Sequence, residues 1–105
     1  MLKSIHFIQS IMAVKVNASH ILVKTEEEAK AVKTELDAGK AFDALAKDRS
    51  MCPSKKNGGS LGWFTHGQMV REFEKAAFSM KKGQISQPVK TQFGYHIIKI
   101  DDTWG

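Results

Sequence analysis

Hydrophobic and polar positions alternate along residues 14–24, which read VKVNASHILVK. One side of this alternation carries Val14, Val16, Ala18, His20 and Leu22, and the other carries Lys15, Asn17 and Ser19. A period of two is typical of a β-strand, because successive side chains point to opposite faces of a sheet. The segment from Ile21 to Val23 is apolar on both sides. The pattern therefore predicts a central strand of a sheet, whose far end is buried on both faces.

From Thr25 onward, apolar residues recur at the spacing of an α-helix instead of at every second position. Thr25 and Glu28 have the spacing of a capping box, in which each residue satisfies a free backbone N–H of the first turn. The apolar positions that follow at helical intervals are Ala29, Val32 and Leu36. Gly39 is a typical stop signal after the last turn. The sequence therefore predicts an amphipathic helix between Thr25 and Gly39.

Two further helices are predicted, and strands and turns fill the rest. The expected helices are residues 41–48, burying Phe42, Leu45 and Ala46, and residues 68–79, with Met69, Phe73, Ala76 and Ala77 on one side. Residues 49–59 are polar and rich in turn formers, so we expect a loop. Short strands are expected at LGWF, at Val89 and at YHIIKI, and TQFG has the length of a hairpin link. This order predicts an α+β fold with one sheet.

The overall composition fits one small globular domain. The chain has 105 residues, of which 42% are hydrophobic and 26% charged. The formal net charge is +5, but the lysines are scattered and the only arginines are Arg49 and Arg71. A nucleic-acid footprint would cluster basic residues on one face. We therefore expect an ordinary solvated basic surface and no nucleic-acid partner.

The beginning of the chain resembles a weak signal peptide. Its apolar run, MLKSIHFIQSIMAV, is interrupted by His6, Gln9 and Ser10 and lacks a clean cleavage site. We interpret residues 1–13 as an N-terminal extension, with an alternative start at Met12, and residues 14–105 as the domain. No run approaches the length of a membrane span, and the single cysteine excludes an internal disulfide. We expect a cytoplasmic monomer with no membrane contact.

Two of the four histidines lie on apolar strand faces. His20 shares its face with Val16 and Leu22, and His96 shares its face with Ile98 and Ile100. A buried imidazole needs a hydrogen-bonding partner, and each histidine could serve the other if the first and last strands pair. A structural pair and a functional pair both fit this pattern. No histidine has a metal-binding neighbour at ligand spacing, so we expect no metal and no other cofactor.

Residues 58–73, GGSLGWFTHGQMVREF, combine turn-forming glycines with large apolar side chains. No Lys-Ser/Thr pair follows the glycines, so this is not a phosphate loop. Cys52 precedes the stretch in a loop, where it could be a thiol nucleophile or an ordinary small side chain. The apolar residues framed by glycines predict a pocket for an apolar group.

Three separated blocks identify a family. The segments ASHILVK, GGSLGWFTHGQMVREFEKAAF and TQFGYHIIKI together resemble the parvulin family of peptidyl-prolyl cis/trans isomerases over about residues 14–102. The resemblance implies an FKBP-like architecture with a four-stranded antiparallel sheet surrounded by three to four helices. It also implies catalysis of rotation about X-Pro bonds in flexible or unfolded polypeptides, which would be the partners of the protein.

The resemblance also implies roles for eight residues. Those expected at the catalytic centre are His20, Cys52, Thr91 and His96, where Thr91 would orient the second histidine and Cys52 would face the substrate bond. Those expected to bind substrate are Leu61, Met69 and Phe73, which would receive the proline ring, and Phe93, which would add a wall. Phe93 departs from members that carry a small hydroxyl residue there.

A second departure concerns phosphate recognition. Members selective for phosphorylated Ser/Thr-Pro carry a long basic loop after the first strand, whereas here Lys24 leads into the acidic run Glu26 to Glu28. Such a run would repel a phosphate, so we expect a general isomerase. Three other functions remain open from the sequence: a holdase that binds chains without isomerising them, a thiol enzyme, and a nucleic-acid binder.

Overall fold

The computed structural model describes residues 13–105, so almost all of the expected N-terminal extension lies outside the described residues. Its centre is one antiparallel four-stranded sheet with the order β2-β1-β4-β3. The strands are β1 (Lys15–Val23), β2 (Ser60–Phe64), β3 (Val89–Thr91) and β4 (Gly94–Trp104). The two longest strands, β1 and β4, lie in the middle and pair along their full length, from Lys15↔Trp104 to Val23↔Tyr95.

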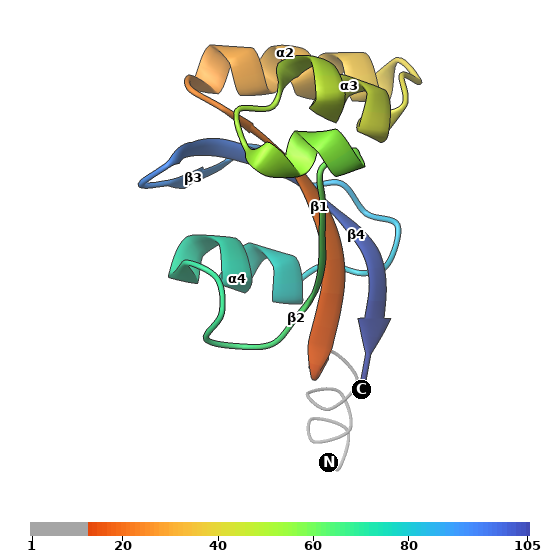
Figure 1. Cartoon of the computed structure of the whole chain (residues 1–105), viewed down its shortest axis with the longest axis vertical. Helices are drawn as coiled ribbons and strands as arrows, with labels where there is room; N and C mark the ends of the chain where they lie inside the picture. The colour runs from red at the N-terminus through yellow and green to blue at the C-terminus, as the bar shows by residue number, and fades with distance from the viewer. Residues whose placement is uncertain (1–12) are drawn as a thin grey trace, which may run out of the picture.

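Helices cover both faces of this sheet. They are α2 (Glu26–Asp37), α3 (Phe42–Arg49), the 3₁₀ helix η1 (Pro53–Asn57) and α4 (Arg71–Phe78). Figure 1 shows α2 and α3 together at one end of the molecule and α4 beside the other half of the sheet. The α+β class and the four-stranded antiparallel sheet predicted from the sequence are confirmed.

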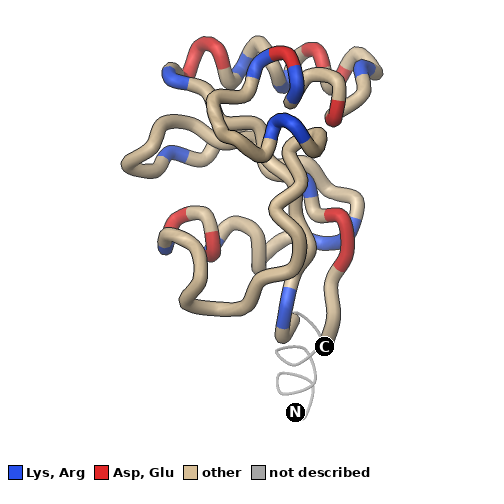
Figure 2. Tube along the Cα trace, viewed as in Figure 1, with Lys and Arg blue, Asp and Glu red and all other residues tan. Residues whose placement is uncertain are grey.

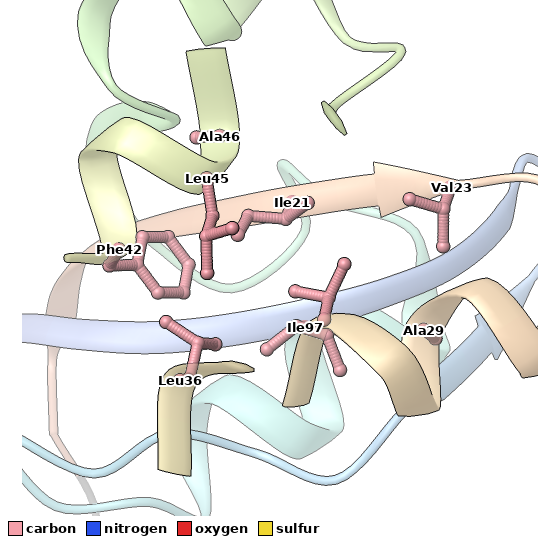
Figure 3. Packing of buried hydrophobic residues seen from close by; sticks show 9 residues of the cluster. Ile21, Val23, Ala29, Leu36, Phe42, Leu45, Ala46 and Ile97 are labelled. Atoms are coloured by element: carbon pink, nitrogen blue, oxygen red, sulfur yellow. The ribbon is translucent and has the colours of Figure 1, made fainter. Parts of the chain in front are cut away.

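Helices α2 and α3 cover one face of the central strands. The cluster joins Ile21 and Val23 of β1 and Ile97 of β4 to apolar residues of the two helices (Figure 3). The helical members are Ala29, Val32, Leu36, Phe42, Leu45 and Ala46. The predicted capping box at the start of α2 is present, with Thr25 and Glu28 bonded reciprocally. This face therefore forms a closely packed apolar core over β1 and β4.

The opposite face of the same strands packs against α4. Val16 and Ala18 of β1 and Ile98 and Ile100 of β4 are completely buried there. They meet a set of apolar side chains from β2 and α4, namely Phe64, Phe73, Ala77 and Phe78. Side chains on the two faces of β1 thus belong to two different cores, as the alternation of residues 14–24 predicted. His20 and His96 lie on this second face, at the edge of its core.

Three segments differ from the sequence-based expectations. The expected loop 49–59 contains η1, which begins at Pro53 and ends at Asn57, and the capping residue Gly58 has the left-handed conformation. The third helix begins at Arg71 rather than at 68, because Val70 has extended backbone angles (ψ 149°). The last strand continues four residues beyond Ile100 to Trp104, since it pairs with the beginning of β1.

Candidate active site

A cavity of about 470 Å³ opens on the α4 face of the sheet. Its walls come from β1, β2, β4, α4, the link between α3 and η1, the link between β2 and α4, and the β3–β4 hairpin. The lining residues are His20, Leu22, Met51, Cys52, Pro53, Leu61, Gln68, Met69, Val70, Phe73, Phe93 and His96. No lining residue carries a permanent charge. The cavity is of a size and polarity that suit a small apolar group.

The apolar wall contains all four residues expected to bind substrate. Phe73 is fixed by α4 and is almost fully buried, while Leu61 and Met69 are half-buried. Phe93 lies at the tip of the β3–β4 hairpin and is 55% exposed. The ring of Phe73 meets both His20 and His96 edge-on, at centroid distances of 5.5 and 5.2 Å. The two histidines therefore form the floor beneath a ring-sized space.

A continuous hydrogen-bonded chain connects the floor residues. His20 Nδ1 lies 2.8 Å from His96 Nδ1, and His96 Nε2 lies 2.7 Å from Thr91 Oγ1. The backbone N–H of Phe93 donates to Thr91 Oγ1 at 3.1 Å. The pairing of β1 with β4 brings these histidines together although they are 76 positions apart in the sequence.

The hydrogen bonds of the floor favour one placement of the protons. Thr91 Oγ1 accepts from Phe93 N–H, so its own proton is available to His96 Nε2. His96 then carries its proton on Nδ1 and donates it to His20 Nδ1. His20 is left with a proton on Nε2, which is buried and has no partner among the described residues. The reverse assignment would leave the hydroxyl proton of Thr91 without an acceptor.

Burial keeps both histidines neutral. Burial and, as the smaller cause, the nearby His96 together lower the pKa of His20 from 6.5 to about 4. Burial also lowers the pKa of His96 from 6.5 to about 4. At neutral pH the floor of the cavity therefore consists of two uncharged imidazoles, each able to donate one hydrogen bond and to accept one.

Cys52 is held at the cavity by bonds to the neighbouring backbone. Ser50 Oγ accepts from the N–H groups of both Leu22 and Cys52, at 3.0 and 3.3 Å. The N–H of Met51 donates to the carbonyl of Leu22 at 2.7 Å. These bonds fasten the link between α3 and η1 to the end of β1. The thiol is half-buried and lies in the wall rather than in the hydrogen-bonded chain of the floor.

The structure brings the eight expected residues together. Seven line the cavity, and Thr91 lies beneath it as the partner of His96. Their roles in binding and catalysis stay predictions. Sequence reasoning did not single out five other lining residues, which are Leu22, Met51, Pro53, Gln68 and Val70. The period of two that selected His20 also selects Leu22. Met51 and Pro53 flank Cys52 in a segment without periodicity, and Gln68 and Val70 flank Met69 at the start of the predicted third helix.

Two further observations concern the residues that the structure describes. Within residues 13–105, no three side chains of His, Cys, Asp or Glu are grouped so that they could hold a metal ion. The helices of this part of the chain are all too short or too polar to cross a membrane.

Comparison with protein families matches residues 12–102 to the rotamase family, described as the PPIC-type PPIase domain. Among curated proteins, the foldase protein PrsA of Geobacillus kaustophilus is 58% identical over 89 residues, which are 84% of this chain and 32% of that foldase. PrsA of Bacillus subtilis is 52% identical over 86 residues, covering 81% of this chain and 30% of the foldase. The chain thus spans about a third of the length of these relatives.

Solved structures agree in fold. The crystal structure of the peptidylprolyl isomerase PrsA from Bacillus anthracis matches with a TM-score of 0.87 and 44% identity, over 98% of this chain and 49% of that one. The solution structure of NmPin, the parvulin of Nitrosopumilus maritimus, matches with a TM-score of 0.75 and 46% identity. That match covers 89% of this chain and 98% of NmPin.

Proposed function

The chain belongs to the parvulin, or PpiC-type, family of peptidyl-prolyl cis/trans isomerases, and we propose that its neutral, mostly apolar cavity is where an X-Pro bond rotates. As an isomerase domain of this family it acts in protein folding. The observation that carries the proposed site is the apolar cavity above a hydrogen-bonded pair of neutral histidines.

The energetic demand on such a site is modest. Rotation about the amide bond faces a barrier of ~18–20 kcal/mol, because resonance is lost as the bond twists. Without a catalyst, X-Pro isomerisation takes tens to hundreds of seconds. An acceleration of a few thousandfold needs roughly 4–5 kcal/mol of stabilisation that is specific to the twisted state. No covalent step is needed to reach that value.

Each group of residues has a part in this mechanism. Leu61, Met69 and Phe73 would grip the proline ring, so that the carbonyl side of the bond turns against a fixed ring. Apolar walls around the carbonyl remove the water that favours the planar, polar amide. The floor histidines and Thr91 would hold the cavity in shape, and Cys52 would set the polarity beside the rotating carbonyl.

The substrate class we propose is unphosphorylated X-Pro sequence in flexible polypeptides. Its support is the short connection between β1 and α2, where Thr25 caps the helix and three glutamates follow directly. These carboxylates would repel a phosphate. Figure 2 shows a further feature, a run without charge from η1 through β2 to α4, because residues 57–70 contain no Lys, Arg, Asp or Glu. This uncharged wall suits apolar neighbours of the proline.

We also propose that the protein works as a cytoplasmic monomer without nucleic-acid or membrane partners. Support comes from the scattered lysines and from a charge pattern with both signs mixed on α2 and α3 (Figure 2). Sedimentation at micromolar concentration tests the monomeric state, and cell fractionation tests the location. Binding assays with DNA and with anionic vesicles at low salt test whether the protein has a nucleic-acid or membrane partner.

Exchange NMR on short X-Pro peptides tests the function directly. Catalytic amounts of the protein should produce cis–trans exchange peaks for peptides with apolar, acidic and phosphorylated residues before proline, with phosphoserine the poorest. The absence of exchange for every peptide, with shifts of the Leu61, Met69 and Phe73 signals on titration, would replace the isomerase by a proline-binding holdase. Full activity after iodoacetamide treatment would exclude a thiol enzyme.

A further inference from the structure

The link between β2 and α4 forms one rim of the cavity and is held in place mainly by side-chain contacts rather than by backbone–backbone hydrogen bonds. This rim loop, residues 65–70, supplies Gln68, Met69 and Val70 to the lining. Among the described residues, no backbone–backbone hydrogen bond involves positions 65–69. A segment without such bonds opens easily, because little holds its backbone in one conformation. The position of Met69 therefore depends on side-chain contacts to the loop.

Glu74 on α4 makes the strongest of these contacts. The N–H of Gly67 donates to Glu74 Oε1 at 2.6 Å. His66 Nδ1 lies 3.1 Å from Glu74 Oε2, so the ring N–H donates to the second carboxylate oxygen. The bond from Gly67 is the first cause that lowers the pKa of Glu74, and the bond from His66 is the next. Both bonds are charge-assisted at neutral pH, and such bonds are about twice as strong as neutral ones.

Other contacts also support the loop, whose Met69 and Val70 pack against the core beside α4. The N–H of Thr65 donates to Gln68 Oε1 at 2.7 Å, which closes the loop on itself. The imidazole of His66 lies over the ring of Phe78, with centroids 3.9 Å apart and planes inclined by 27°. Of the hydrogen bonds and ring contacts, only those of Glu74 and His66 join the loop to the helix. Glu74 reaches two successive residues of the loop at once.

We propose that Glu74 is a positioning residue for substrate binding, which holds the rim loop so that Met69 closes the proline cavity. The inference rests on the proposed function of that cavity. Glu74 does not line the cavity, and it acts through Gly67 and His66. Among the described residues, no hydrogen bond or ion pair joins Glu74 to His20, His96 or Thr91. We therefore expect the loss of Glu74 to change how tightly the substrate is bound rather than how fast the bound X-Pro bond rotates.

The test compares three variants of the full chain. Glu74→Ala removes both bonds, and Glu74→Gln keeps an oxygen that can accept from Gly67. The matched control is Glu72→Ala, because Glu72 is an exposed carboxylate in the same first turn and is also favoured there by the helix dipole. We expect Glu74→Ala to raise KM for an Ala-Pro peptide roughly fivefold, the size of one lost hydrogen bond, with kcat within about twofold. Glu74→Gln should recover most of the loss, and Glu72→Ala should match the wild type.

A second measurement does not depend on catalysis. The Met69 methyl signal and the exchange rate of the Gly67 amide should change in Glu74→Ala and stay near wild-type values in Glu72→Ala. Unchanged signals, equal KM values for the two alanine variants, or an effect confined to kcat would overturn the positioning role. An inactive wild type would overturn the isomerase assignment instead, and the loop would then be judged by these NMR signals and by the dissociation constant of the peptide.

Discussion

His20 and His96 are buried against each other, and this burial makes the stability of the protein depend on pH in the acidic range. The pKa of each ring is lowered from 6.5 to about 4 in the folded state. Between these values the unfolded chain binds more protons than the folded protein. The contribution of the pair to stability is therefore complete above pH 6.5 and is lost as the pH falls toward 4.

We expect the free energy of unfolding to fall between pH 7 and pH 5, where most carboxylates are still ionised. Each unit of lowered pKa corresponds to about 1.4 kcal/mol for a group that must stay neutral. Urea unfolding of the wild type and of His20→Leu at both pH values measures the effect. The variant should be less stable at pH 7 and should show a smaller pH dependence. Equal slopes for the two proteins would show that the histidines are not a buried neutral pair.

Cys52 lies in the wall of the cavity rather than in its floor. Substitutions at this position can distinguish a thiol nucleophile from a polar side chain that only lines the wall. We expect Cys52→Ser to keep measurable activity, since a hydroxyl supplies similar polarity at the same place. Cys52→Asp should keep more activity than Phe73→Ala, which removes a buried ring from the apolar wall. Exchange NMR on an Ala-Pro peptide gives all three rates. Complete loss of activity in Cys52→Ser, with an unchanged circular dichroism spectrum, would restore the nucleophile.

The sequence predicted the floor of the cavity better than its rim. His20 and His96 stand out because polar side chains interrupt apolar faces of period two. Pro53 belongs to a segment without a period, and Gln68 falls inside a predicted helix that begins only at Arg71. The contribution of both residues to the cavity depends on how tertiary contacts place the backbone. The same reason explains why the third helix was predicted to begin too early. Met69 continues the helical pattern of apolar residues, although the helix begins at Arg71.

At the scale of elements, the start of α2 is secured by its capping box. Glu28 N–H donates to Thr25 Oγ1 at 3.2 Å, and Thr25 N–H donates to Glu28 Oε1 at 3.1 Å. Thr25→Ala should lower the free energy of unfolding by about 1 kcal/mol. Thr34→Ala in the same helix is the control, because that hydroxyl only bonds the carbonyl of Lys30. Peptide isomerisation should be unchanged in both variants, since α2 lies on the other face of the sheet.

The junction between η1 and β2 allows no side chain at Gly59. A Cβ there would lie 2.5 Å from the carbonyl oxygen of His20, and φ is +92°. Gly39 has a similar φ of +100° but open space around it. Gly39→Ala should therefore show the backbone cost alone, of about 1 kcal/mol, and Gly59→Ala should cost about 2 kcal/mol more. Thermal unfolding compares them, and equal losses would mean that the junction relaxes around the new methyl group.

At the scale of the whole molecule, the two central strands come from opposite ends of the described chain. Strands β1 and β4 pair through nine residue positions and carry both cores. No short stretch of sequence can form this centre alone, so we expect its opening to require global unfolding. Native-state hydrogen exchange should show the slowest amides in β1 and β4 and faster ones in the edge strands β2 and β3. Slower exchange in an edge strand than in β1 would contradict this order.

The pairing of β1 with β4 also determines how the domain can be combined with other proteins. The N–H of Val14 donates to the carbonyl of Trp104 at 2.8 Å, so the chain enters and leaves the domain at one point. That point is at the end of the sheet opposite the β3–β4 hairpin and its Phe93 (Figure 1). A domain with adjacent entry and exit can interrupt a surface loop of a host protein without stretching it. Residues 13–105 could thus be inserted into a host protein as one unit, with the β3–β4 hairpin at the end away from both junctions.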